Sequence, residues 1–348
     1  MGISLCVIAR DEEKNIEKCL SSVQGLVNEI IFVDTGSKDK TISIAKKFTG
    51  KIFNFTWTDN FSDAKNFALS KATGDWILFL DADETISESD HQKIENLTKT
   101  GFLGFSFIQR NYTNETGGFE LTSTKNDSYQ ESKSAFGYVP RKMVRFFKNL
   151  PGIKFEGAIH ENIAESILKL GKIKDTNIPI HHFARSTKEK IKKYIELEKR
   201  NLKDDFYSYC KLGSQLHTLG EIPEAIIYLK KSISKNPDFP YSWLELGAIM
   251  LELGSLKEAE KALQEAEHLT NSPMLYNYLG ILYSMQGKYE EAITYLKKAI
   301  SLLPNNPDFH FNLGSAYLNT GEKNQAYTEM KKAISLNPEY SKRVKFSS

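Results

Sequence analysis

The chain has little cysteine and no long apolar run, and both absences narrow the choice of function. Its 348 residues include 3 cysteines and no Cys-x-x-Cys pair, so neither a disulfide framework nor a thiolate zinc site is expected. We expect reduced thiols in a cytoplasmic protein. No stretch approaches the ~20 apolar residues of a membrane span. The apolar run at residues 3–9 is also too short for the core of a signal peptide.

The sequence also has no large excess of positive or negative charge, and it has none of the common phosphate-binding loops. Lys and Arg number 46 against 44 Asp and Glu, a net charge of +2, which favours neither nucleic acid nor an anionic membrane as a partner. No Gly-x-Gly-x-x-Gly follows the first predicted strand, and no P-loop motif occurs anywhere. The phosphates of any bound nucleotide must therefore be met by a metal ion and by side chains.

Short apolar runs alternate with helical stripes along the first half of the chain. The expected strands are residues 3–9, 29–33, 52–55, 76–80, 104–108, 142–147 and 178–183. This alternation predicts an α/β domain with a Rossmann-like, mostly parallel sheet. The polar segment 111–135 has no periodicity and predicts a long loop.

Carboxylates or charged turns follow three of the predicted strands, and the turn after the first strand contains Asp11. Asp34 ends the second strand, and Asp81, Asp83 and Glu84 end the fourth. Because the carboxyl ends of parallel strands meet at one edge of a sheet, where ligands bind, we expect these groups to lie close together. Crowded carboxylates repel one another, so a divalent cation is expected among them. The alternative is an acidic turn that only caps the next helix.

Two histidine motifs follow in the same half. His160 and Glu161 come after a glycine turn, and His181 and His182 lie in the last predicted strand. Neighbouring residues of a strand point to opposite faces, so at most one of the latter pair faces the acidic edge. His182 is the candidate for a third metal ligand, and a structural role for both histidines is the alternative.

Four segments, in the same order, resemble motifs of the family-2 glycosyltransferases with the GT-A fold. They are residues 3–13, 33–41, 64–69 and 74–84. The resemblance extends to about residue 182 and implies a nucleotide-diphosphate-sugar donor, an Mn²⁺ or Mg²⁺ ion and, usually, inversion at the anomeric carbon. Two positions depart from it: Asp11 stands where Asn is common, and Lys65 stands where Arg is commoner. Lysine lacks the two-pronged contact of arginine.

The resemblance also implies roles for individual residues. The expected donor-binding residues are Ala9, Arg10, Glu13, Asp34, Lys65 and Asp81. Asp83 is expected to hold the metal, together with Asp81 and His182. Glu161 is the candidate general base, since the family tends to carry His-Glu at this place. Which of His160, His181 and His182 binds metal stays open.

An internal repeat fills the second half. The Leu-Gly pairs that contain Gly213, Gly247, Gly280 and Gly314 recur at intervals of 34, 33 and 34 residues. A second glycine and an alanine recur in phase with them. This period and these small residues resemble tetratricopeptide repeats, in which helix pairs stack into a solenoid with a concave surface. We expect the aromatic residues of the repeats to pack between helices.

Four parts of the chain follow from these patterns. They are a GT-A domain at 1–185, a helical connector at 186–205, four repeats at 206–340 and a tail at 341–348. We predict a glycosyltransferase of the hexosyltransferase class that uses a nucleotide sugar, with UDP-sugars favoured, and a protein, peptide or glycan acceptor. The repeats would hold that acceptor or a second copy of the chain. The alternatives are a binding scaffold with a degenerate enzyme domain, and a nucleotidyltransferase, whose Gly-rich N-terminal loop is absent here.

Overall fold

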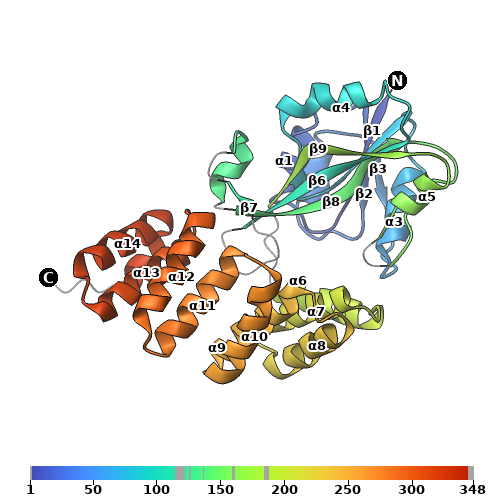
Figure 1. Cartoon of the computed structure of the whole chain (residues 1–348). Coiled ribbons are helices and arrows are strands. Elements are labelled where there is room, and N and C mark those ends of the chain that lie inside the picture. Colours follow the sequence, from blue (N-terminus) through green and yellow to red (C-terminus); the bar gives the residue numbers. More distant parts are fainter. Residues whose placement is uncertain are drawn as a thin grey trace. The chain divides into compact units, whose positions relative to one another are not determined.

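The computed structural model describes residues 2–113, 122–124, 127–135, 137–158, 161–183 and 188–343. These residues form two compact units (Figure 1). The first contains the main strands and the short helices of the N-terminal half, and the second contains the helices from α6 (Lys188–Arg200) onward.

The described part of the N-terminal half contains a nine-stranded sheet. Its strands are β1 (Ile3–Ala9), β2 (Glu29–Asp34), β3 (Ile52–Asn54), β4 (Trp76–Asp81), β5 (Glu84–Thr85), β6 (Gly104–Thr113), β7 (Thr122–Ser123), β8 (Gly137–Lys148) and β9 (Ile173–His182). Their order is β3-β2-β1-β4-β8-β6-β9-β5, and β7 pairs with β8 at the side. The first four strands in this order are parallel, and β8 runs antiparallel to β4. The sheet is therefore mixed, with the expected parallel half.

Both faces of the central strands are buried. Leu5 and Val7 of β1 lie in one apolar cluster, and Cys6 and Ile8 lie in another on the opposite face. The helices of this unit are α1 (Ile16–Ser21), α2 (Thr41–Ala45), α3 (Phe61–Leu69), α4 (His91–Leu97) and α5 (Ala164–Leu168), with 3₁₀ turns η1 (Glu88–Asp90) and η2 (Gln130–Ser134). Burial on both sides explains why these strands are continuous apolar runs rather than alternating ones.

The prediction of a structureless loop at 111–135 was wrong for the described part of that segment. Strand β6 continues to Thr113, Thr122 and Ser123 form β7, and η2 follows. The pairing of Thr122 with Tyr138 uses backbone groups, so the polar side chains of β7 give no sign of it. Residues 114–121 and 125–126 lie outside the described part.

The carboxylate-bearing strand ends do share one edge. Strand β1 pairs with β2 so that Ala9 lies opposite Asp34, and with β4 so that Ile8 lies opposite Asp81. Asp34 and Asp81 therefore flank the end of β1. The sheet register confirms that these two carboxylates end the strands on either side of β1, at the same edge of the sheet.

The second unit consists of helix pairs. After α6 come α7 (Phe206–Leu219), α8 (Ile222–Lys235), α9 (Pro240–Glu252), α10 (Leu256–Leu269), α11 (Pro273–Met285), α12 (Tyr289–Leu302), α13 (Pro307–Thr320), α14 (Lys323–Leu336) and η3 (Pro338–Lys342). Each odd-numbered helix from α7 packs on the next one. A Cβ on Gly280 would lie 2.5 Å from Cγ of Leu296, so only glycine allows α11 and α12 to approach this closely.

The aromatic side chains of the repeats pack between helices, as predicted. Phe309 and Tyr317 are buried, and the Tyr283 ring stacks on Tyr295. Phe311 of α13 contacts Tyr340 of η3, with ring centroids 5.2 Å apart, so η3 packs on the last helix pair. No helix in the described part of the chain is both long and apolar enough to cross a membrane.

Candidate functional site

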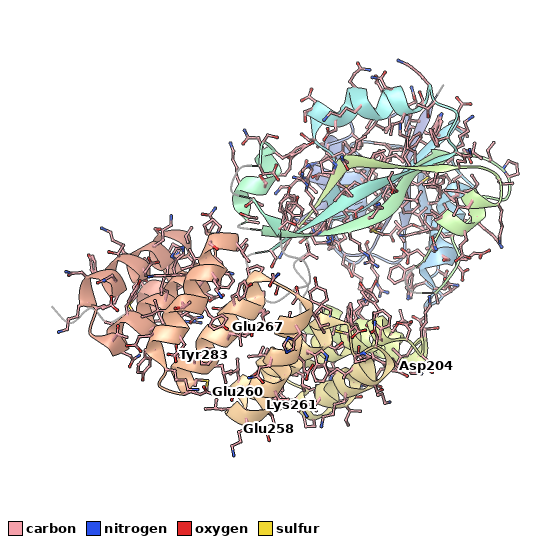
Figure 2. All side chains as sticks on the ribbon, in the orientation of Figure 1. Asp204, Glu258, Glu260, Lys261, Glu267 and Tyr283 are labelled. Carbon is pink, nitrogen blue, oxygen red and sulfur yellow. The ribbon has the colours of Figure 1, made fainter. Side chains whose placement is uncertain are left out.

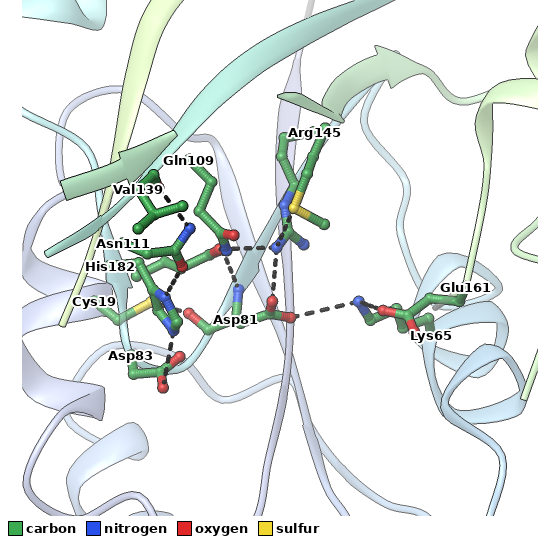
Figure 3. A network of polar contacts seen from close by, with 12 residues as sticks. Cys19, Lys65, Asp81, Asp83, Gln109, Asn111, Val139, Arg145, Glu161 and His182 are labelled. Atoms are coloured by element: carbon green, nitrogen blue, oxygen red, sulfur yellow. Dashed lines mark hydrogen bonds and ion pairs between the residues drawn. The ribbon is translucent and has the colours of Figure 1, made fainter. Parts of the chain in front are cut away.

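The turn between β4 and β5 is the centre of the candidate site (Figure 3). Glu84 is fully buried and folds back over this turn, so that its Oε2 accepts the backbone N–H of Asp81 at 2.8 Å. Its Oε1 accepts hydrogen bonds from Gln109 and from Arg145, the latter at 2.8 Å. Glu84, predicted as part of an acidic strand end, therefore closes the turn.

Arg145 of β8 supplies the positive charge at this turn. Its side chain is 2% exposed, and its Nη2 donates to Asp81 Oδ2 at 2.6 Å as well as to Glu84. Burial alone would raise the pKa of Asp81, but Arg145 and Lys65 outweigh burial and hold that pKa well below its usual range. Asp81 is thus a fixed negative charge.

Lys65 of α3 connects this turn to the predicted base. Its side chain is buried, with Nζ 3.4 Å from Asp81 Oδ1 and in an ion pair with Glu161 Oε1. The ammonium also lies over the rings of Phe79 and Phe155, at 5.0 and 5.3 Å from their centroids. Both oxygens of Asp81 therefore face a cation, and Glu161 is tied to one of the two.

Asp83 and His182 meet because β5 pairs with β9, with Glu84 opposite His182. The His182 Nε2 lies 3.3 Å from Asp83 Oδ2, and its Nδ1 lies 2.6 Å from Asn111 Oδ1. Asn111 donates its amide N–H to the carbonyl of Val139 at 3.0 Å, which turns its Oδ1 toward the histidine. We infer that Nδ1 carries the proton and that Nε2 faces Asp83.

His181 lies on the opposite face, as the strand alternation predicted. It is fully buried, its Nδ1 is 2.8 Å from the Tyr112 hydroxyl, and the two rings are parallel. Of the two neighbouring histidines, His182 is the one beside the acidic turn. His160 lies outside the described residues.

Asp34 is held by the loop that follows it. Its carboxylate is 4% exposed, and Oδ2 accepts the backbone N–H groups of Gly36 at 2.9 Å and Ser37 at 3.0 Å. Ala9, its partner in the register, accepts the N–H of Thr35 at 2.9 Å. The ends of β1 and β2 therefore form one rigid edge next to Asp81.

Arg10 and Glu13 belong to the loop after β1. Arg10 is exposed, with Nε 4.0 Å from Asp11 Oδ2. Glu13 accepts the backbone N–H of Lys40 at 3.1 Å, and so joins this loop to the one after β2. The structure thus brings Lys65, Asp81 and Glu161 into one network, whereas Glu13 contacts the loop after β2 and Arg10 lies near Asp11 of its own loop.

The prediction from sequence missed Arg145, Asn111 and Gln109. Arg145 has a signal that could have identified it, since a charged residue between apolar neighbours in a strand must find a partner when buried. Asn111 and Gln109 have no such signal in the sequence, because polar residues at the end of a strand are common. Their roles depend on the pairing of β6 with β9, which places Asn111 opposite His182.

The donor atoms at Asp83 and His182 fit a divalent cation. Burial opposes ionisation of His182, but its contact with Asp83 raises the pKa of the imidazole, so a positive charge between Nε2 and the carboxylate oxygen is favourable. Either a proton on Nε2 or a divalent cation supplies that charge. Carboxylate oxygen and imidazole nitrogen together suit a cation such as Mn²⁺. No group of three His, Cys, Asp or Glu side chains in the described part of the chain is arranged to hold a metal, so the protein would supply two of the ligands.

Comparison with known proteins agrees with this architecture. Residues 4–156 match the family described as Glycosyl transferase family 2, and residues 228–261, 280–321 and 307–340 match tetratricopeptide repeat families. A TPR repeat-containing protein of Synechococcus elongatus is 30% identical over 327 residues, which cover 87% of this chain and 76% of that protein.

Two further similarities are more partial. The SPbeta prophage-derived glycosyltransferase SunS of Bacillus subtilis is 29% identical over 252 residues, and the match covers 68% of this chain but 54% of SunS. The crystal structure of MamA matches 44% of the chain at 26% identity and a TM-score of 0.38. Taken with the GT-A-like sheet and the four helix pairs, the matched segments show that the chain has an N-terminal domain of the family-2 glycosyltransferases and C-terminal tetratricopeptide repeats.

Proposed function

We propose that the protein is a metal-dependent glycosyltransferase of the hexosyltransferase class that transfers a sugar from a nucleotide diphosphate sugar with inversion at the anomeric carbon. A UDP-sugar is the favoured donor, and a protein, peptide or glycan is the acceptor. The observation that carries this proposal is the set of charged side chains around the turn after β4, where Lys65 joins Asp81 to Glu161 and where Asp83 meets His182.

The nucleoside end of the donor is proposed to lie at the ends of β1 and β2. Asp34 Oδ1 receives only a long hydrogen bond, at 3.3 Å from the Ser37 nitrogen, and so keeps acceptor capacity for an N–H of the base. Ala9 would contact the base from the neighbouring strand, and Arg10 and Glu13 would border the site from the next loop. Hydroxyl groups of the ribose would donate to Asp81, whose charge is fixed by Arg145.

Asp83 and His182 are proposed to hold Mn²⁺ or Mg²⁺. A divalent cation there would neutralise the charge that develops on the departing nucleoside diphosphate. Asn111 contributes by fixing the ring of His182 with Nε2 toward Asp83. Because Arg145 and Lys65 engage both oxygens of Asp81, Asp81 would join the ligands only if one of these contacts opened.

Glu161 is proposed to remove the proton of the acceptor nucleophile, opposite the leaving group. In the structure its Oε1 is held in an ion pair with the Lys65 ammonium. The diphosphate of a bound donor is a competing anion for Lys65. Donor binding would therefore free Glu161 for the acceptor and delay base catalysis until the donor is in place.

The repeats are proposed to select the acceptor. Stacked helix pairs offer a continuous concave surface that suits a peptide or protein. The alternative is that the last repeat binds a second copy of the chain through the outer face of α14. The composition of that face argues against this alternative. The exposed residues of α14 are Lys323, Asn324, Gln325, Tyr327, Thr328, Lys331, Lys332 and Ser335, nearly all of them polar.

The direct test is incubation of the full chain with UDP-sugars and Mn²⁺, with release of nucleoside diphosphate as the readout. We expect slow hydrolysis by water and loss of turnover in Asp83→Asn. The matched control is Asp175→Asn, which changes an exposed carboxylate paired with Lys142. Release of pyrophosphate would instead indicate a nucleotidyltransferase, and no turnover with any nucleotide sugar would indicate a scaffold. Full activity in excess EDTA would refute the metal dependence.

A further inference from the structure

Arg145 is a buried charge between the apolar neighbours Val144 and Phe146 of β8, and packing alone does not explain it. Its neighbours Phe146 and Phe147 lie in the two cores of the sheet. The pairing of β8 with β4 ends at Phe146 opposite Leu78, so Arg145 comes next to the end of β4. Its Nε is buried without a hydrogen-bond partner among the described residues. An apolar side chain of similar volume would avoid that unsatisfied donor.

The contacts of Arg145 span the turn that carries Asp83. A single nitrogen, Nη2, donates to Asp81 at 2.6 Å (Figure 3) and also to Glu84 at 2.8 Å. These two carboxylates stand on either side of residues 82 and 83. Glu84 closes the turn a second time by accepting the N–H of Asp81. Both ends of the turn are therefore bound to one buried guanidinium.

Asp83 is the one carboxylate of this turn that contacts His182 rather than Arg145. Of the three acidic groups, Asp81 and Glu84 are thus paired with Arg145, and Asp83 remains to bind another ligand. Without Arg145, the carboxylates of Asp81 and Glu84 would repel each other across the turn and lose their common anchor. The position of Asp83 would then be less well defined.

We propose that Arg145 is the positioning residue of this site: by bridging Asp81 and Glu84 it fixes the turn that presents Asp83 beside His182 for a divalent cation. This role rests on the proposed function, because it concerns the metal site named there. Arg145 itself touches neither metal nor donor. It acts through the backbone of the turn.

Loss of the bridge and loss of a positive charge are expected to change the affinity for the cation in opposite directions. Removal of a positive charge near a cation site should raise cation affinity through Coulomb interaction. Loss of the bridge should lower that affinity, since residues that orient metal ligands typically contribute about 10–100-fold to affinity. The direction of the change in affinity therefore separates the two effects.

The experiment is titration of the full chain with Mn²⁺ alone, with free Mn²⁺ followed by electron paramagnetic resonance. We expect Arg145→Met to bind Mn²⁺ about 10–100-fold more weakly than the unaltered protein. Arg145→Lys should recover most of the loss, because one nitrogen makes both contacts. Arg141→Met, which changes an exposed arginine of the same strand, is the matched control and should bind normally. Recovery by lysine would show that residue 145 acts through its charge. If residue 145 only filled space, methionine should serve at least as well as lysine.

Equal or tighter Mn²⁺ binding by a folded Arg145→Met variant would overturn the proposal and leave the proposed function intact. If that variant does not fold, the double variant Arg145→Met with Glu84→Gln removes the bridge without changing net charge. Unchanged affinity in the double variant would overturn the proposal equally. Failure of the unaltered protein to bind Mn²⁺ would reject both the bridge and the metal dependence of the proposed function.

Discussion

Replacement of Lys65 tests whether the charged network is a coupled unit. Lys65→Met removes a buried ammonium and leaves Glu161 without its cation, while methionine still fills the space against Phe79 and Phe155. Removal of one partner from a buried ion pair costs roughly 3–5 kcal/mol. The Glu161 side chain keeps 14% of its surface exposed, so water relieves part of this cost. We therefore expect a loss near the lower limit, about 3 kcal/mol in the free energy of unfolding.

The double variant Lys65→Met with Glu161→Gln should be much less destabilised than Lys65→Met alone, because no buried charge is then left unpaired. Coupling energies of about 0.5–3 kcal/mol are usual for residues in direct contact. The assay is urea denaturation followed by tryptophan fluorescence in a Trp243→Phe background, in which Trp57 and Trp76 report on the first unit alone. A coupling energy near zero would refute the assignment of Lys65 and Glu161 to one buried pair.

Three further predictions concern other parts of the molecule. Burial opposes ionisation of Glu29, but hydrogen bonds from Lys51, Ser4 and Thr73 lower its pKa from 4.5 to about 2. Its stabilisation is therefore present above pH 4.5 and lost as the pH falls toward 2. Glu29→Gln should lower the free energy of unfolding at pH 7 by up to about 3 kcal/mol, with a difference that shrinks in acid denaturation below pH 4.5. Asp34→Asn keeps an acceptor for the Gly36 N–H but loses the charge, and should weaken UDP binding in calorimetry by ~1–3 kcal/mol; an unchanged Kd would contradict the donor site. Gly280→Ala should destabilise the second unit by about 1–3 kcal/mol in thermal melting, because its Cβ would lie 2.5 Å from Leu296, whereas Gly50→Ala meets no atom within 4 Å.

The features that could be predicted from sequence are those that repeat or that end a strand. The apolar runs of β1, β2 and β4 are long enough to mark buried strands, and the register then places Asp34 and Asp81 on one edge. The period of the Leu-Gly pairs predicted the four helix pairs, because Gly280 and its equivalents lie where the two helices of a pair are too close for a Cβ. Alternation along β9 correctly separated His181 from His182.

The partners of the charged groups could not be predicted, because they come from segments far away in the sequence. Arg145 is 64 residues from Asp81, and Glu161 is 96 residues from Lys65. The roles depend on these pairings rather than on residue type. Asp81 has the sequence context of a metal ligand, yet both of its oxygens contact protein cations. Glu161 has the context of a base, yet it is paired with a buried lysine.

The remaining pair, Asp83 with His182, depends on a strand of two residues. Strand β5 consists of Glu84 and Thr85, and its pairing with β9 alone sets His182 beside the turn. So short a strand contributes little stability by itself, since only a few backbone hydrogen bonds form. It must therefore be held by side chains, and Glu84 belongs both to this strand and to the contacts of Arg145. The buried ion pairs at the turn thus hold the backbone on which the proposed metal site is built, which is why the unsatisfied donor on Arg145 is tolerated there.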